Sequence, residues 1–412
     1  MWRCAGSNAE YHAGGVNINM VAAPPQAKTF ALSFFAYYAY VGVFAPYASL
    51  YFAERGMNGV QIGILMSMMQ VTRIFGPNLW GWVADRQGKR VQVLRATAFC
   101  ALLSLFGMLV GRSFVHFFAV MVFLNTFTSS QGPLSEALML SEMRGDLTHY
   151  GRLRLWGSVG FIFSVMLGGQ LLDYFGVLSF PWLALALLLL VCVVSLKMRD
   201  PQEPAAHAAS ANTRSSWAVL RQPEVLAFFT STCLMVAAHA ALYVYYSLYL
   251  ERIGYSKSLI GAMWSLGVVA EIVFFYFQAP LFRRFGARKV MLVSLGIAVL
   301  RFAMIGFGAQ SLLLLLLAQV LHAATFGAHH SASVVTMQRW FAGPLQARGQ
   351  ALYTSISYGL GGSLGGLVLS VGWERINPHS VYWLASLMAL LALLAALLSY
   401  HWQQRRALPA GL

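Results

Sequence analysis

Charged side chains are scarce in this chain of 412 residues: only 10% are Asp, Glu, Lys or Arg, and only 13 residues are acidic. A soluble protein of this size needs far more charge to cover its surface. The four cysteines, at positions 4, 100, 192 and 233, form no CxxC pair and have no metal-ligand spacing, so we interpret them as small buried side chains. We find no catalytic constellation and expect no enzyme activity, metal or cofactor.

Hydrophobic residues are abundant instead, at 58% of the chain. They form repeated runs of about 20 residues, the length that spans a bilayer core. Lipid offers no hydrogen bonds, so such runs must be helical. The sequence therefore predicts an all-α integral membrane protein with twelve transmembrane helices. We expect them at about residues 29–53, 60–83, 91–111, 114–141, 152–174, 177–197, 224–250, 259–281, 289–309, 311–337, 350–371 and 379–402.

The formal net charge of +15 could indicate a nucleic-acid partner. The basic residues lie in short loops between the apolar runs, however, so we expect a lipid bilayer and no nucleic acid. Lys and Arg concentrate in alternate loops, which predicts that both termini face the cytoplasm. The expected parts are a disordered cytoplasmic extension (1–27), an N-terminal six-helix half (28–197), a cytoplasmic linker (198–222), a C-terminal six-helix half (223–404) and a cytoplasmic tail (405–412).

The chain aligns with itself without a gap at an offset of 198 residues, which places residue 47 on 245 and residue 73 on 271. The string Tyr-Ala-Ser-Leu-Tyr at 47–51 matches Tyr-Tyr-Ser-Leu-Tyr at 245–249. The same offset places Arg73 on Glu271, two opposite charges inside predicted membrane helices. Such a duplication is typical of a transporter built from two parallel repeats.

The loop after the second predicted helix reads Gly81-Trp-Val-Ala-Asp85-Arg86-Gln-Gly88-Lys-Arg90. This string resembles the Gly-x-x-x-Asp-Arg-x-Gly-Arg-Arg signature of the major facilitator superfamily, which implies the two-halved major facilitator fold. The resemblance also implies a gating loop made of Gly81, Asp85, Arg86, Gly88 and Arg90. In the second half the signature is degraded, although an Arg, a Gly and an Arg remain at 284, 286 and 288.

Three further strings indicate which group within the superfamily the chain resembles. They are Tyr-Gly-Arg-Leu-Arg-Leu-Trp-Gly at 150–157, Trp-Ser-Leu-Gly-Val-Val-Ala-Glu at 264–271, and Leu-His at 321–322 with Thr-Phe at 325–326. Together they resemble the bacterial 3-phenylpropionic acid permease group, which is related to the lactose permease branch. The resemblance covers about residues 30 to 400. It implies transport but does not identify the solute, because one fold carries many cargoes.

Glu271 is the strongest candidate for proton coupling, because a lone carboxylate at membrane depth must bind a proton or find a cation. Arg301 and Arg73 are its candidate partners. The resemblance to lactose permease adds His322 at a matching position. It also marks a departure, because Thr325 stands where that permease has the acid that carries the proton. A fixed structural salt bridge is the alternative role for Glu271.

Glu136 and Arg154 match the positions of a sugar-binding charge pair in the lactose permease pattern; a structural ion pair is the alternative. Other candidates for substrate binding are the aromatic and histidine residues Tyr38, Trp156, Trp264, His239 and His329. His322 and His329 are seven residues apart, a spacing that predicts one helix face. Packing is the alternative role for each of these residues.

We therefore predict a proton-coupled importer of a small organic solute such as an aryl carboxylate, with Arg154 or Arg301 holding the carboxylate. It would work as a monomer in a bacterial inner membrane. Proton symport of a neutral sugar or nucleoside is the first alternative. A drug-efflux antiporter is less favoured. Exporters of the superfamily that this chain resembles usually carry a Gly-Pro pair in the fifth helix, and the fifth predicted helix here has no proline.

Overall fold

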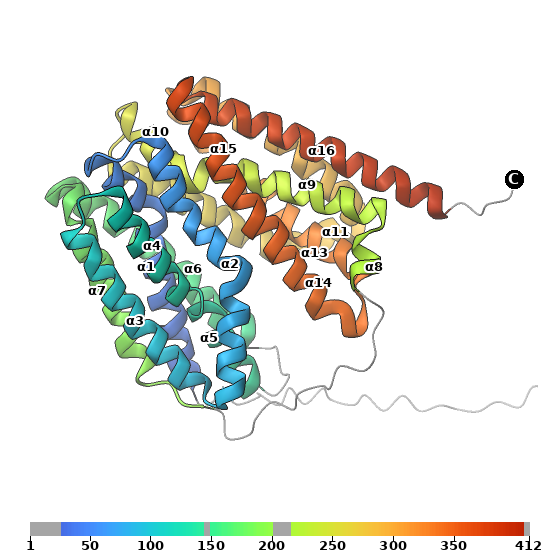
Figure 1. Ribbon diagram of the computed structural model, residues 1–412. Helices are drawn as coiled ribbons and strands as arrows, with labels where there is room; N and C mark the ends of the chain where they lie inside the picture. The colour runs from blue at the N-terminus through green and yellow to red at the C-terminus, as the bar shows by residue number, and fades with distance from the viewer. Residues whose placement is uncertain (1–25, 144–148, 201–215, 408–412) are drawn as a thin grey trace, which may run out of the picture.

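The computed structural model describes residues 26–143, 149–200 and 216–407. Most of the predicted N-terminal extension, most of the linker and the last residues of the predicted tail lie outside this part of the chain. The described residues form helices arranged as two bundles, one blue to green and one yellow to red in Figure 1. The all-α major facilitator fold predicted from the sequence is confirmed.

Each predicted membrane segment of the N-terminal half is helical. The helices are α1 (Ala27–Glu54), α2 (Gly59–Gln87), α3 (Arg90–Val110), α4 (Phe114–Thr128), α5 (Gln131–Glu142), α6 (Tyr150–Phe175), the short η1 (Val177–Ser179) and α7 (Phe180–Ser195). The fourth predicted segment is thus divided between α4 and α5.

The C-terminal half begins after the short helix α8 (Ser216–Leu220). Its elements are α9 (Pro223–Ala240), η2 (Ala241–Tyr245), α10 (Tyr246–Arg252), α11 (Lys257–Gly308), α12 (Leu312–Val320), η3 (Ala323–Ala328), α13 (His329–Trp340), η4 (Gly343–Leu345), α14 (Gln346–Tyr353), η5 (Thr354–Gly361), α15 (Gly362–Arg375) and α16 (Ser380–Ala407). Elements η2, η3 and η5 are π-helical turns within longer helices. Such wide turns are frequent at functional sites.

Eight helical stretches in the described part of the chain are long and apolar enough to cross a membrane. One of them, α11, has 52 residues and contains a break at Gly286, so it holds the eighth and ninth predicted segments. Segments such as α2 are helical but carry polar residues at membrane depth, which lowers their hydropathy. Three of those polar residues, Ser67, Gln70 and Arg73, line the cavity described below.

The internal duplication is visible in the backbone. Gly56 and Gly254, 198 residues apart, have positive φ angles of 81° and 99°. Gly88 and Gly286, at the same offset, have φ angles of 63° and 72°. Glycine adopts this left-handed conformation without steric cost. Equivalent turns therefore follow equivalent helices in both halves.

The two halves meet mainly along two helix pairs, α6 with α11 and α2 with α15. Figure 1 shows α2 beside α15 at the centre of the molecule. Among the described residues, the hydrogen bond from the Ser355 Oγ to the Ile74 carbonyl (3.4 Å) is the last one between halves toward the predicted cytoplasmic end. The polar contacts between halves therefore gather at the opposite end, which is predicted to be periplasmic.

Candidate functional site

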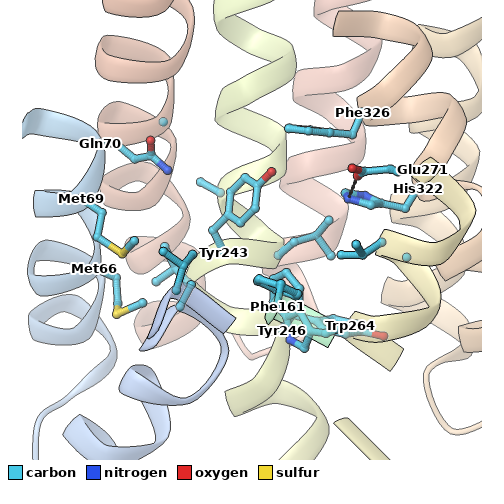
Figure 2. A pocket seen from close by; sticks show the side chains of 18 of the residues that line it. Met66, Met69, Gln70, Phe161, Tyr243, Tyr246, Trp264, Glu271, His322 and Phe326 are labelled. Atoms are coloured by element: carbon cyan, nitrogen blue, oxygen red, sulfur yellow. Dashed lines mark ion pairs between the residues drawn. The ribbon is translucent and has the colours of Figure 1, made fainter. Parts of the chain in front are cut away.

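A cavity of about 330 Å³ lies between the two halves. Its walls come from α1, α2 and α6 of the N-terminal half and from η2, α11 and the helix α12–α13 of the C-terminal half. Figure 2 shows Met66, Met69 and Gln70 on one side of it, with Glu271 and His322 on the other. This volume is at the low end for small-molecule sites, and the walls are apolar with a few polar groups, as such sites usually are.

Equivalent faces of α2 and α11 form opposite walls of the cavity. The positions paired by the 198-residue offset are Met66 with Trp264, Met69 with Gly267, Gln70 with Val268 and Arg73 with Glu271, and all eight line the cavity. Residues spaced by three, four and seven share one face of a helix. Duplication thus produced two facing walls whose chemistry then diverged, with a cation on one and a carboxylate on the other.

Glu271 forms an ion pair with His322, whose Nε2 lies 2.7 Å from the carboxylate Oε1. The two side chains are only 16% and 10% exposed. Among the described residues, neither Arg73 nor Arg301, the partners expected from the sequence, lies within ion-pair distance of Glu271, and His322 takes that position. The His322 ring also stacks on Phe326, with ring centres 5.4 Å apart, which fixes the orientation of the imidazole toward the carboxylate.

Arg301 is completely buried and does not line the cavity. Its guanidinium donates hydrogen bonds to the Ala318 carbonyl (2.6 Å), the Thr325 Oγ1 (3.0 Å) and the Gln319 Oε1 (3.5 Å). A buried cation is tolerated only when its donors are satisfied. Thr325, at the position of the missing acid, therefore serves as one of the acceptors that hold Arg301.

Arg73 and Arg154 are the cations that line the cavity. The Arg154 Nη2 donates a hydrogen bond to the Tyr38 hydroxyl at 2.6 Å, and the guanidinium lies 4.3 Å from the centre of the Tyr38 ring. The Arg73 guanidinium lies 5.9 Å from the centre of the Tyr358 ring. Stacking on aromatic rings orients arginine while leaving N–H donors for an anion.

The predicted pair of Glu136 and Arg154 does not form. The Glu136 Oε1 instead accepts a hydrogen bond from the Tyr150 hydroxyl, and Glu136 is absent from the cavity wall. Trp156 also lies away from the cavity and is 49% exposed. The aromatic residue of α6 that does line it is Phe161, which contacts the Trp264 ring.

A spacing of seven places His322 and His329 on one face only in a regular α-helix, but the π-helical turn η3 lies between them and changes the register. His322 lines the cavity, whereas His329 is buried away from it. His239 is also buried outside the cavity wall, with its Nδ1 2.9 Å from the Met235 carbonyl and its Nε2 3.4 Å from the Thr325 Oγ1. It contacts the site indirectly, since its ring centre is 6.0 Å from that of His322.

The residues of the predicted gating loop lie at the junction of α2 and α3. Because α2 continues to Gln87, Gly81, Asp85 and Arg86 are helical, and Gly88 ends the helix in the left-handed conformation. Arg90 begins α3 and forms an ion pair with Asp85 at 3.1 Å.

Sequence reasoning did not single out Phe161, Phe326, Met66, Met69 or Gln70. The signal for the α2 residues was present, because Met66, Met69 and Gln70 precede Arg73 by seven, four and three residues on one helix face. Phe326, which lies in the π-helical turn η3, belongs to one of the strings that carry the family resemblance, but no helix spacing pointed to its place in the cavity.

Comparisons with known proteins support the transporter fold. The model of the MFS_1 like family matches residues 28–384. The chain is 32% identical to the probable 3-phenylpropionic acid transporter of Escherichia coli K12 over 88% of this chain and 95% of that protein. It is 26% identical to the maltose permease of Geobacillus stearothermophilus over 91% and 95%. A crystal structure of the nucleoside transporter NupG superposes with a TM-score of 0.82 at 18% identity, covering 91% of this chain and 99% of that one.

Proposed function

The chain belongs to the MFS_1 like family of membrane transporters, and from that premise we propose that it imports an aryl carboxylate together with one proton. The observation that carries the proposal is the composition of the central cavity. It combines cations that can hold a carboxylate, aromatic walls that can hold a ring, and one carboxylate that can bind a proton.

The carboxylate of the cargo would bind Arg154 and Arg73 rather than Arg301, whose donors are already satisfied in the interior. Guanidinium groups bind carboxylates through paired, charge-assisted hydrogen bonds. The ring of the cargo would lie between Phe161, Tyr243 and Trp264, which line the same cavity. Offset or edge-to-face contacts with these rings favour a flat apolar group.

The proton would bind Glu271, the acidic residue among those that line the cavity. Its present partner is His322, and protonation of the carboxylate would remove the charge that attracts the imidazole. Loading one proton with one carboxylate anion transfers no net charge. Transport would then proceed by rocking of the two halves around the cavity, as in other transporters built from repeats.

The oligomeric state, the membrane and the orientation of the protein are also part of the proposal. We propose that the protein acts as a monomer in a bacterial inner membrane with both termini in the cytoplasm, on the basis of the distribution of Lys and Arg among the loops. In that orientation the arrangement described above is inward-facing.

The test is uptake by purified protein in proteoliposomes, with 3-phenylpropionate, thymidine and maltose compared as initial rates. A weak acid also crosses lipid in its neutral form, so each rate is taken above that of protein-free vesicles. The proposal expects uptake of 3-phenylpropionate, faster when the outside is acidic. It is refuted by a 3-phenylpropionate rate equal to that of empty vesicles.

A neutral sugar or nucleoside is the second candidate cargo. It is favoured by the two amide side chains of the cavity, Gln70 and Gln319, which can hydrogen-bond hydroxyl groups. Proton-stimulated uptake of thymidine or maltose, without uptake of the carboxylate, would establish this alternative.

A further inference from the structure

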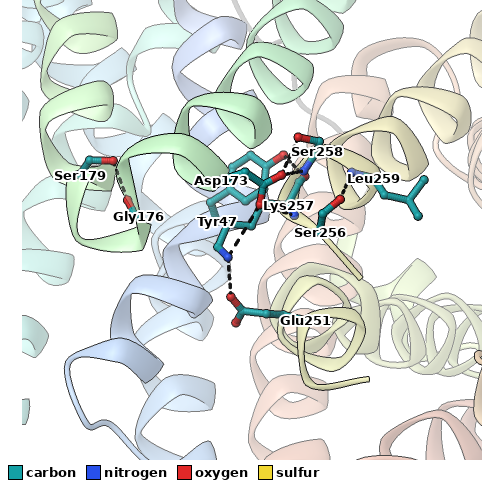
Figure 3. A network of polar contacts seen from close by, with 9 residues as sticks. All are labelled: Tyr47, Asp173, Gly176, Ser179, Glu251, Ser256, Lys257, Ser258 and Leu259. Atoms are coloured by element: carbon teal, nitrogen blue, oxygen red, sulfur yellow. Dashed lines mark hydrogen bonds and ion pairs between the residues drawn. The ribbon is translucent and has the colours of Figure 1, made fainter. Parts of the chain in front are cut away.

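The two halves are joined at the predicted periplasmic end by hydrogen bonds that involve the first residues of α2 and α11. Figure 3 shows the group around the start of α11, where Tyr47 and Asp173 come from the N-terminal half. A second group surrounds the start of α2. Each group connects a helix N-terminus of one half to side chains of the other half.

In the first group, the Tyr47 hydroxyl lies 2.7 Å from the Val165 carbonyl of its own half and 3.2 Å from the Lys257 carbonyl of the other half, and its single proton is shared between the two acceptors. The Asp173 carboxylate accepts hydrogen bonds from the backbone N–H groups of Lys257 (2.9 Å) and Ser258 (2.8 Å) and from the Ser258 hydroxyl (2.5 Å). The Lys257 Nζ lies 3.9 Å from the same carboxylate. We call this group the α11 clasp.

In the second group, the Tyr245 hydroxyl donates to the Gly59 carbonyl at 3.0 Å. The Gly59 N–H donates to the Glu374 Oε2 at 2.9 Å. The Tyr245 ring also stacks on Trp373, with ring centres 5.1 Å apart. We call this group the α2 clasp. In both clasps a carboxylate from one half occupies the positive end of a helix of the other half, where negative charge is stabilised.

The tyrosines and the helix starts of the two clasps are equivalent by the internal duplication, whereas the carboxylates are not, because the offset places Asp173 on Val371. The 198-residue offset places Tyr47 on Tyr245 and Gly59 on Lys257. Tyr47 bonds to the Lys257 carbonyl and Tyr245 bonds to the Gly59 carbonyl, so these two hydrogen bonds occupy equivalent positions. A glycine at equivalent positions makes room for each hydroxyl. A Cβ on Gly63 would lie 2.5 Å from the Tyr245 hydroxyl, and a Cβ on Gly261 would lie 2.6 Å from the Tyr47 hydroxyl.

We propose that these two clasps together hold the predicted periplasmic end of the transporter closed, and that both must open before the cavity can face that side. The inference rests on transport by alternating access and requires neither a particular cargo nor proton coupling. The gating residues are thereby Tyr47, Tyr245, Asp173 and Glu374, none of which lines the cavity. Their polar groups can be hydrated when the clasps open, which makes the closure reversible.

The α11 clasp is the stronger of the two. Asp173 receives three hydrogen bonds, whereas Glu374 receives one from the helix that it caps. Hydrogen bonds to a charged acceptor contribute more than neutral ones. Loss of the Asp173 charge is therefore expected to shift the closed-to-open equilibrium further than loss of the Glu374 charge.

The test measures the separation of the halves without any cargo. Spin labels are attached at Leu178 and Ile376, exposed positions near the predicted periplasmic end of each half, in a variant whose four natural cysteines are replaced by serine. Pulsed electron–electron double resonance then gives the distribution of distances between the two labels. The ratio of long to short distances reports the open and closed populations. Size-exclusion chromatography verifies that each variant is folded.

Tyr47→Phe and Tyr245→Phe each remove only a hydroxyl and are expected to raise the ratio of open to closed molecules about fivefold. Asp173→Asn is expected to raise it about tenfold. The matched controls are Tyr51→Phe and Tyr249→Phe, because these hydroxyls bond within their own halves, to the Met108 carbonyl and to His379. The controls should leave the ratio unchanged.

The double variant Asp173→Asn/Glu374→Gln gives the decisive comparison. It weakens both clasps at once and is expected to give the largest open population. The proposal is overturned when this variant has the same distance distribution as the parent, or when the control tyrosine variants shift the distribution as much as Tyr47→Phe and Tyr245→Phe do. A failure of 3-phenylpropionate uptake would refute the proposed cargo but would leave this measurement unaffected.

Discussion

Replacement of Glu271 by glutamine tests the proposed proton coupling directly. Glutamine keeps the size of the side chain and an oxygen that can accept a hydrogen bond from His322, 2.7 Å away in the structure, but it cannot take up a proton. Glu271 is the acidic residue among those that line the cavity, so one proton per cargo molecule is expected. One pH unit changes the external proton concentration about tenfold, and it therefore changes the fraction of transporters that carry a proton about tenfold as long as that fraction is small.

Wild-type protein should therefore take up 3-phenylpropionate about tenfold faster per unit of external acidification, below saturation, whereas Glu271→Gln should show a ratio of about one. The variant should still exchange labelled for unlabelled cargo, since exchange needs no net proton movement. Glu54→Gln is the matched control, because Glu54 is exposed and lies outside the cavity. The reasoning is refuted if Glu271→Gln responds to the gradient as wild type does.

Three further predictions test the site. Arg154→Gln should raise the KM for the carboxylate about tenfold or more, because charge-assisted hydrogen bonds contribute about 1.5–3 kcal/mol, and Arg154→Lys should recover part of the loss in the same uptake assay. Thr325→Val should lower stability by about 1–3 kcal/mol through loss of an acceptor for buried Arg301, seen as a lower melting temperature in detergent; an unchanged melting temperature would contradict this. Phe161→Ala should weaken uptake while Trp156→Ala should not, and equal effects would argue against the cavity wall described here.

The duplication made much of the architecture predictable. An offset of 198 residues predicted that Arg73 and Glu271 occupy equivalent positions, and both line the central cavity from opposite halves. Helix positions were also predictable, because apolar runs in lipid must form helices. The division into two helical halves could therefore be predicted from the length of the apolar runs and from the internal sequence similarity alone.

The contacts inside the site were less predictable. The π-helical turn η3 changes the register between His322 and His329, and no sequence pattern marked it. The partner of Glu271 depends on side-chain packing within the C-terminal half, where His322 lies beside the carboxylate while Arg301 is satisfied by neutral acceptors. On α6, Phe161 rather than Trp156 lines the cavity, because helix rotation is set by packing against α1 and α11.

The division of charges between the halves gives a physical reason for coupling. The two cations that line the cavity, Arg73 and Arg154, belong to the N-terminal half, whereas the Glu271 carboxylate and its partner His322 belong to the C-terminal half. An anionic cargo bound to the arginines would place a second negative charge near Glu271. Like charges in a site of low dielectric repel each other, so the carboxylate would bind a proton as the cargo binds. Under the proposed mechanism, cargo and proton therefore load together because each reduces the cost of the other.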